Sequence, residues 1–208
     1  MLEFDWQQFE TREYSRRQET SFVTLTTRGY LTVEGEAPLR THDPAFLTQA
    51  LLLETIAARI SEGPDAGIPI SGFRSYRPYP VQAVWSGGPT IASRQHFQLW
   101  LKQLLFVTKK AVGAAITALE MGPEAKPIQF KQLEEGTEIQ ISSPETLTDA
   151  SPAWQTLTAA VQAKNLDLRL PNTHREVYLD GVRKENVLVR LAIESVPGPI
   201  DARMITVN

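Results

Sequence analysis

Apolar and polar residues alternate clearly in the segment His-Arg-Glu-Val-Tyr-Leu, which begins at His174. Successive side chains of a strand point to opposite sides, so Val177 and Leu179 share one face of this predicted strand. His174, Glu176 and Tyr178 share the other face. We expect the apolar face to belong to a core, whereas the polar, aromatic and acidic face either meets water or lines a cavity.

A second alternating segment, Val187–Ile193, follows a turn that contains an Asp-Gly pair and predicts a hairpin with the first segment. Matching the apolar faces places Val177 opposite Val189, and the same register places Glu176 opposite Arg190. In one interpretation Glu176 and Arg190 form a partly exposed ion pair, which contributes only about 0 to 1 kcal/mol. In the other, Glu176 is the acidic floor of a ligand cavity.

The first half of the chain predicts strands, a long helix and a further strand. Residues 22–25 and 30–33 are rich in β-branched and aromatic residues, as strands are. Asp43 and Pro44 indicate a helix start, because an Asp side chain accepts hydrogen bonds from free amides and proline suits the first helical position. Apolar residues then recur at helical spacing. A strand pattern returns over residues 70–85.

The middle and second half predict further helices and a repeat of the same order. Ser93 is expected to cap a short helix that carries Trp100, and Thr108 to cap another. Residues 130–142 alternate as a strand, and Ser151 precedes a helix that begins with proline. The hairpin described above follows this helix.

The order strand, helix, strand, strand therefore occurs twice, in half-repeats of about 20–122 and 127–196. We predict an α+β fold of two similar modules with a mostly antiparallel sheet, helices on one face and a groove on the other. One domain is expected over residues 1–196, and a tail over 197–208 that adds an edge strand or stays mobile. The residues expected on helix-covered faces are Val177, Leu179, Val189, Ile139 and Ile141.

Composition narrows the class of protein. The formal charge is −3, from 24 acidic and 21 basic residues, without a basic stripe, so direct nucleic-acid binding is not expected. The absence of cysteine excludes disulfides and thiolate metal sites. The N-terminus lacks the apolar segment of a signal peptide, and no stretch is apolar enough to span a membrane. We therefore expect a cytoplasmic protein without membrane contact.

The search for chemical motifs leaves few options. The three histidines lack the spacing of a metal site, and no phosphate loop, dinucleotide fingerprint or nucleophilic-serine elbow is present. We therefore predict no metal and no cofactor. Aromatic residues crowd one region, where a ring that faces a cation contributes roughly 0.5 to 2 kcal/mol. These residues, Tyr76, Tyr79, Trp85 and Trp100, either form an aromatic box or belong to the core. We favour the groove for Trp85 and the core for Trp100.

Residues 174–180 resemble the His-x-Glu-Ile-Tyr-Leu-Ser/Asp motif of the GyrI-like small-molecule-binding family. Further segments resemble that family in the same order, over about residues 4 to 194. Two positions depart from the pattern: Gln82 replaces the family's middle glutamate, and residues 142–146 replace a His-x-Gly-Pro-Tyr segment. The further matching segments are Asp5-Trp6, Tyr79–Trp85, Gln103–Val107 and Leu188–Arg190.

The resemblance implies a stand-alone member whose two modules face a shared groove for a lipophilic, often cationic, small molecule. Some such members hydrolyse cyclopropane-bearing alkylating antibiotics. In a binding protein, Glu176 would compensate a ligand cation. In a hydrolase, Glu176 would act as general base and Tyr178 would polarise a carbonyl. The sequence leaves both hypotheses open beside a structural role, and the predicted ligand-binding residues are Glu176, Tyr178, Trp85, Tyr79, Tyr76, His174 and Arg190.

Overall fold

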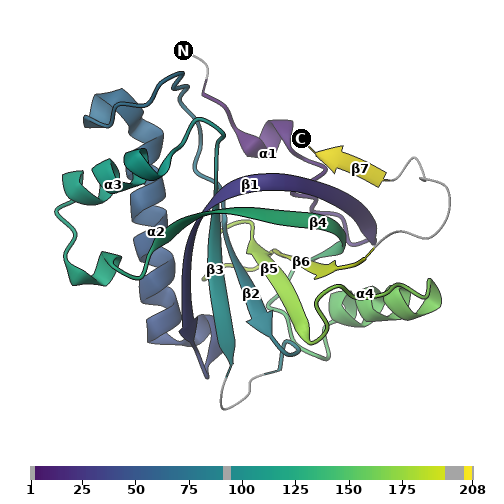
Figure 1. Cartoon of the computed structure of the whole chain (residues 1–208). Helices are drawn as coiled ribbons and strands as arrows, with labels where there is room; N and C mark the ends of the chain where they lie inside the picture. The colour runs from purple at the N-terminus through teal and green to yellow at the C-terminus, as the bar shows by residue number, and fades with distance from the viewer. Residues whose placement is uncertain (1–2, 91–94, 195–203, 208) are drawn as a thin grey trace.

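A computed structural model describes residues 3–90, 95–194 and 204–207. Its central feature is a sheet whose strands follow the order β3-β2-β5-β6-β4-β1-β7, and in which β1 also pairs with β3. Six strands therefore close into a ring, and β7 pairs with the outer side of β1 as a parallel edge strand (Figure 1). All pairings within the ring are antiparallel. The strands are β1 (Ser21–Glu36), β2 (Val81–Ser86), β3 (His96–Gln103), β4 (Gln129–Ser143), β5 (Thr173–Tyr178), β6 (Val187–Ala192) and β7 (Met204–Val207).

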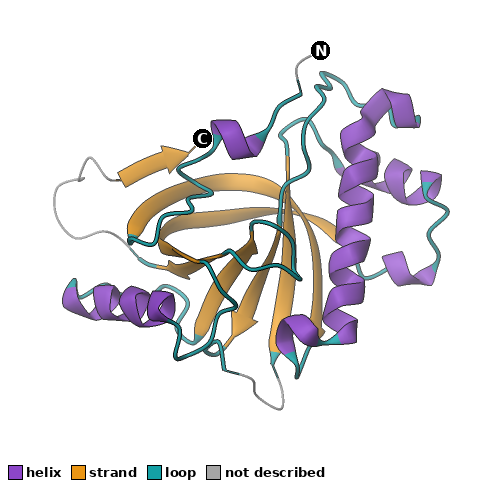
Figure 2. Ribbon diagram, turned by 180° about the vertical axis from the view of Figure 1, so that it is seen from behind, coloured by secondary structure: helices purple, strands orange, loops and turns teal. Residues whose placement is uncertain are grey.

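The helices lie outside the ring. They are α1 (Trp6–Phe9), α2 (Pro44–Glu62), α3 (Lys109–Ala118) and α4 (Pro152–Ala163), with a 3-10 turn η1 (Arg40–His42) before α2. The long α2 runs along one side of the ring, and α4 packs on β4 at a distance from it (Figure 2). The predicted α+β class and the order strand, helix, strand, strand in each half are confirmed.

Helix α2 begins and packs as its sequence predicts. The Asp43 carboxylate accepts a hydrogen bond from the Ala45 amide at 2.9 Å, and Pro44 occupies the first helical turn. The apolar stripe of α2 is buried against the outer face of β1, β2 and β3. At its first turn, the Phe46 ring centroid lies 5.1 Å from those of both Trp85 and Phe97.

Part of the inner face of the ring is polar and charged. Arg175 of β5 forms ion pairs with Glu135 and Glu138 of β4, and its guanidinium lies 5.1 Å from the centre of the Trp100 ring of β3. Neither β3 nor β4 neighbours β5 in the sheet, so these contacts cross the interior. From β1, Arg28 reaches Glu135 at 2.7 Å. Polar strand faces therefore meet, as predicted, but they meet inside the ring. Glu176 is not among them, because it lies on the outer face.

The predicted register of the β5–β6 hairpin is wrong by one residue. Glu176 pairs with Val189, and Arg190 pairs with Arg175 on the inner face. Val177 pairs with Leu188, so it also lies on the inner face rather than under a helix. Alternation does not mark the helix-covered face of β5, because both faces of these strands are buried in a closed ring. Val189, Ile139 and Ile141 do lie on the outer face, which β4 and β6 share.

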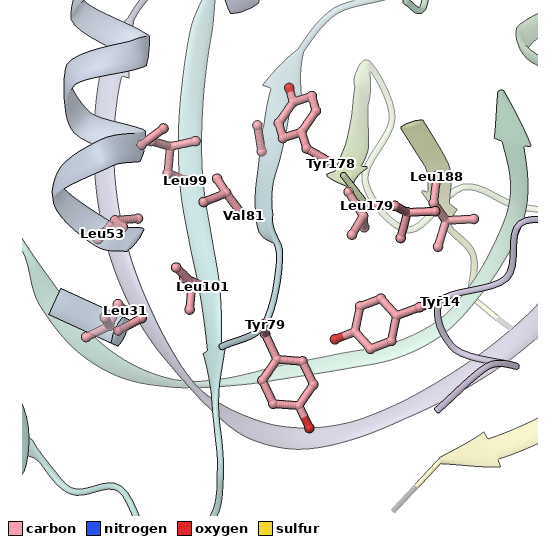
Figure 3. Packing of buried hydrophobic residues seen from close by; sticks show 14 of the residues in the cluster. Tyr14, Leu31, Leu53, Tyr79, Val81, Leu99, Leu101, Tyr178, Leu179 and Leu188 are labelled. Carbon is pink, nitrogen blue, oxygen red and sulfur yellow. The ribbon is translucent and has the colours of Figure 1, made fainter. Parts of the chain in front are cut away.

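Figure 3 places Leu179 beside Leu188, so this second residue predicted under a helix also lies toward the ring interior. The expected short helix around Trp100 is wrong as well, because residues 96–103 form strand β3. Phe97, Trp100 and Leu101 fit helical spacing, but Phe97, Leu99 and Leu101 equally fit a buried strand face. Pairing with both β1 and β2 decides for the strand. The predicted cap at Ser93 lies outside the described residues, as do residues 197–203 and 208 of the tail predicted over 197–208.

Two further differences concern strand lengths. The strands predicted at 22–25 and 30–33 form one strand, β1, whose first part pairs with β4 and whose last part pairs with β3. The pattern over 70–85 yields a strand only over β2, after the Tyr79-Pro80 step. The second half follows the prediction closely, with β4 and α4 at the expected positions.

Candidate functional site

A cavity of about 430 Å³ opens on the outer face of the ring, where β5 ends. Four segments surround it: the 3-10 turn η1, the first turns of α2, the loop after β4, and the turn between β5 and β6. Its wall and floor are formed by Arg40, Thr41, His42, Leu47, Thr146, Leu147, Glu176, Tyr178, Val182, Arg183, Lys184, Glu185 and Val187.

The floor of the cavity is a buried carboxylate with three hydrogen-bond partners. Glu176 is 2% exposed. One of its oxygen atoms accepts from Arg40, which forms an ion pair with it, and lies 2.9 Å from Nε2 of His174. The other oxygen accepts from the Tyr178 hydroxyl at 3.0 Å. Because Glu176, His174 and Tyr178 alternate along β5, the strand itself sets these three side chains on one face.

His174 connects this carboxylate to the backbone. Its Nδ1 lies 2.8 Å from the carbonyl oxygen of Gly87, and its Nε2 lies 2.9 Å from Glu176. A carbonyl and a carboxylate can only accept hydrogen bonds, so both ring nitrogen atoms of His174 face acceptors. The Trp154 ring of α4 packs on it at 5.2 Å.

Trp85 supports the floor from behind. Its indole Nε1 donates to the Tyr178 hydroxyl at 3.0 Å, so that hydroxyl accepts from Trp85 and donates to Glu176. The guanidinium of Arg40 lies 4.6 Å from the centre of the Trp85 ring, within the range of a cation–π contact. The resulting cluster, Arg40, Trp85, His174, Glu176 and Tyr178, is called the Glu176 cluster below.

The charges of the Glu176 cluster follow from burial and from these partners. Burial raises the pKa of Glu176, but the hydrogen bond from His174 and the charge of Arg40 outweigh it and hold that pKa below its usual value. Burial and the neighbouring Glu176 charge raise the pKa of Tyr178 well above its usual value. At neutral pH the site therefore contains a carboxylate and a neutral phenol.

A second hollow of about 600 Å³ adjoins the cavity. The two share Leu47 of α2 and residues 182–184 of the β5–β6 turn, and the second extends along α2 to Leu51, which is 63% exposed. Asp180 fixes the turn, because Arg16 donates to it at 2.6 and 2.9 Å. Together the hollows form a groove with a polar floor and a mixed outer part, in which Pro44, Leu47, Leu51 and Val182 supply the apolar surface.

The structure brings together some of the predicted site residues. Glu176 and Tyr178 line the cavity, and His174 and Trp85 contact them directly. Arg190 does not meet Glu176. It lies fully buried on the inner face of the ring, where it donates to Gln140 at 3.0 Å.

Tyr79 and Tyr76 lie away from the cavity. Figure 3 shows Tyr79 beside Tyr14 and apart from Tyr178, and the Tyr79 hydroxyl donates to Glu10 at 3.0 Å. The Tyr76 hydroxyl donates to Gln103 at 3.2 Å. Both rings are buried among aromatic neighbours. Of the predicted aromatic walls only Tyr178 lines the cavity, and the fully buried Trp85 contacts Tyr178 from behind.

Sequence reasoning missed Arg40, which takes the place at Glu176 that was predicted for Arg190. It lies between the end of β1 and the predicted helix start at Asp43, in a segment with no apolar period to orient its side chains. Its backbone is in the left-handed region, with φ of 52°, which is uncommon for a residue other than glycine. The available signal was a charged residue three positions before the helix cap Asp43.

Three crystal structures of Listeria innocua proteins are similar to this chain. One, named a hydrolase, has a TM-score of 0.78 and 16% identity, and the match covers 92% of this chain and 100% of that chain. A second protein named a hydrolase has a TM-score of 0.78 and 15% identity, and the match covers 93% of this chain and 100% of that chain. An uncharacterized conserved protein has a TM-score of 0.77 and 17% identity, and the match covers 92% of this chain and 100% of that chain. This chain has their fold. At these identities the likeness concerns the fold alone.

Sequence comparison adds no assignment, because no protein-family model and no curated protein matches the chain. Within residues 3–90, 95–194 and 204–207, no three His, Asp or Glu side chains gather closely enough to hold a metal ion. Among the same residues, no helix combines the length and the apolar composition that are needed to cross a membrane.

Proposed function

We propose that the cavity at Glu176 binds a lipophilic small molecule, in the manner that the GyrI-like resemblance implies. One observation carries the proposal: a buried carboxylate lies at the floor of a cavity of about 430 Å³ that continues into a partly apolar hollow along α2. Small-molecule sites combine concave apolar walls with a few placed polar groups, and commonly have volumes of roughly 300 to 1,000 Å³.

Hydrolysis is the second candidate function. It is favoured by the Tyr178 phenol, which stands between Trp85 and Glu176 at the cavity floor, and by the names of two proteins that share the fold. In this hypothesis Glu176 takes a proton from water, whose oxygen bonds to a carbon of a strained cyclopropane. The ring bond breaks, and its electron pair moves to a conjugated carbonyl oxygen, which is protonated to a phenol.

Binding ranks above hydrolysis because of the state of Glu176. Both carboxylate oxygen atoms already accept hydrogen bonds, and the pKa of Glu176 lies below its usual value. A general base works best when its pKa is near the working pH. The carboxylate of this cluster is therefore suited to anchor polar groups more than to remove a proton from water.

A thermal-shift screen of lipophilic compounds tests the proposal. A ligand at 100 times its dissociation constant stabilises the fold by about 2.7 kcal/mol, which corresponds to roughly 5 to 10 °C for a chain of this length. Leu47→Trp places a large ring in the cavity and should abolish the shift. Ala58→Trp, on an exposed position of the same helix, should retain it.

Two outcomes would count against binding at this cavity. One is a screen without hits. The other is a set of hits that stabilise Leu47→Trp as much as the parent. Hits that carry a cyclopropane should also be followed by mass spectrometry. Addition of one water, lost in Tyr178→Phe, would favour hydrolysis over binding alone.

A further inference from the structure

We propose that Arg40 decides the charge class of the ligand, and that the cavity accepts a neutral lipophilic molecule with a hydrogen-bond-accepting oxygen. The inference rests on the proposed function and specifies its ligand. It departs from the expectation of a cationic ligand, because Glu176 has an internal cation that the sequence did not indicate.

Arg40 occupies both features that a ligand cation would use. Its guanidinium forms an ion pair with Glu176 and lies 4.6 Å from the centre of the Trp85 ring. The side chain is only 6% exposed. A cation that enters the cavity must therefore displace Arg40 from the carboxylate and from the Trp85 ring. The displaced guanidinium would then need another partner for its charge.

The backbone holds Arg40 in this position. The Arg40 amide donates to the Ala37 carbonyl at 2.9 Å, and the Asp43 amide donates to the Arg40 carbonyl at 3.0 Å. These bonds close the η1 turn around a residue with φ of 52°. Left-handed backbone at such a residue persists where its surroundings determine it. Arg40 is thus a built part of the floor, and its inward direction is set by the turn.

The remaining chemistry of the cavity favours an acceptor over a cation. A guanidinium has five N–H donors. Among the described residues, one nitrogen atom of Arg40 donates to Glu176 and another donates to the Gly88 carbonyl. Further donors are left for a carbonyl-type oxygen. Around the carboxylate, the charge of Arg40 compensates the one negative charge of Glu176, and His174 and Tyr178 complete its hydrogen bonds. An added cation would therefore find no uncompensated negative charge there.

The inference can be tested with two probes of closely similar shape. Triphenylphosphine oxide is neutral and carries an acceptor oxygen, and methyltriphenylphosphonium replaces that oxygen by a methyl group on a cationic centre. Dissociation constants of both are measured by calorimetry. The parent protein should prefer the oxide. Arg40→Met, which frees Glu176 and the Trp85 face, should shift the ratio of the two constants toward the cation by about tenfold or more.

Two variants control this result. Arg59→Met removes an equal charge from a partly exposed position of α2 and should keep the ratio of the parent, because salt screens distant surface charges. Arg40→Met with Glu176→Gln removes both charges together, so no uncompensated carboxylate is buried if Arg40→Met alone does not fold. In the double variant the ratio should move toward one.

The outcomes separate the two proposals. If both probes bind with a ratio that neither Arg40→Met nor the double variant changes, the inference about Arg40 is overturned and the binding function stands. If the parent already prefers the phosphonium, the inference is also overturned. If neither probe binds the parent or any variant, the proposed function fails for this ligand class, and the inference fails with it.

Discussion

Tyr178 has two hydrogen-bonding duties in the Glu176 cluster, since its hydroxyl accepts from Trp85 and donates to Glu176. Both partners are buried. A polar group that loses its partner inside a protein keeps the cost of its desolvation, whereas an unpartnered hydroxyl can be removed at little cost. The contribution of a single hydroxyl therefore depends on what remains when it is gone.

We predict that Tyr178→Phe lowers the free energy of unfolding by about 1 to 3 kcal/mol, because it leaves the Trp85 indole without an acceptor. Chemical denaturation followed by circular dichroism measures this change. Tyr14→Phe is the matched control, because the buried Tyr14 hydroxyl has no hydrogen-bond partner among the described residues. Equal losses in the two variants would contradict the role assigned to Tyr178.

At the scale of the element, the end of α2 depends on a glycine. Gly63 caps the helix with φ of 57° and ψ of −130°, and its amide donates to the Ile60 carbonyl. This backbone region is essentially restricted to glycine. A Cβ at this position would also meet the ring of Phe73. Helix α2 carries Leu47 and follows η1, so its fixed end helps to position the cavity wall.

Gly63→Ala should therefore cost roughly 3 kcal/mol or more, from backbone strain together with overpacking against Phe73. Gly67→Ala provides the comparison. Gly67 has φ of 74° and nothing within 4 Å of an added Cβ, so its substitution should cost only about 1 to 2 kcal/mol. The urea concentration at the unfolding midpoint should therefore be lower for Gly63→Ala than for Gly67→Ala. The reverse order would contradict this account.

Sequence patterns predicted the elements better than their pairing. The start of α2 could be predicted because Asp43 and Pro44 act locally, and the Glu176, Tyr178 face could be predicted because strand alternation is local as well. The register of β5 and β6 could not, because both faces of these strands are buried and periodicity no longer marks the core. Arg40 could not be predicted as the partner of Glu176, because a turn with φ of 52° directs it there.

At the scale of the whole molecule, the charges inside the ring join strands that are distant in sequence. Glu135 of β4 forms ion pairs with Arg28 of β1 and Arg175 of β5, and accepts from Tyr30. Burial raises the pKa of Glu135, but the charges of the two arginines outweigh this effect and lower that pKa from 4.5 to about 2. The ionised form of Glu135 is therefore the one that stabilises the fold.

Since the folded-state pKa of Glu135 lies below its unfolded value, its contribution is complete above pH 4.5 and is lost as the pH falls toward 2. Glu135→Gln should lower stability at neutral pH by roughly 3 to 5 kcal/mol, because two buried arginines lose a partner. It should also flatten the acid dependence below pH 4.5. Urea titrations at several pH values measure both effects, and the exposed neighbour Glu134, changed to Gln, should alter neither.

The closed ring also sets the order in which the protein can fold during its synthesis. Strand β1, made first, can pair with β3 and then with β4, and these pairings leave β2 and β4 with open edges. Only the β5–β6 hairpin, the last part of the ring to be made, joins those edges. A nascent chain that stalls after β4 and before β5 therefore presents two unpaired strand edges, which are templates for association with other chains.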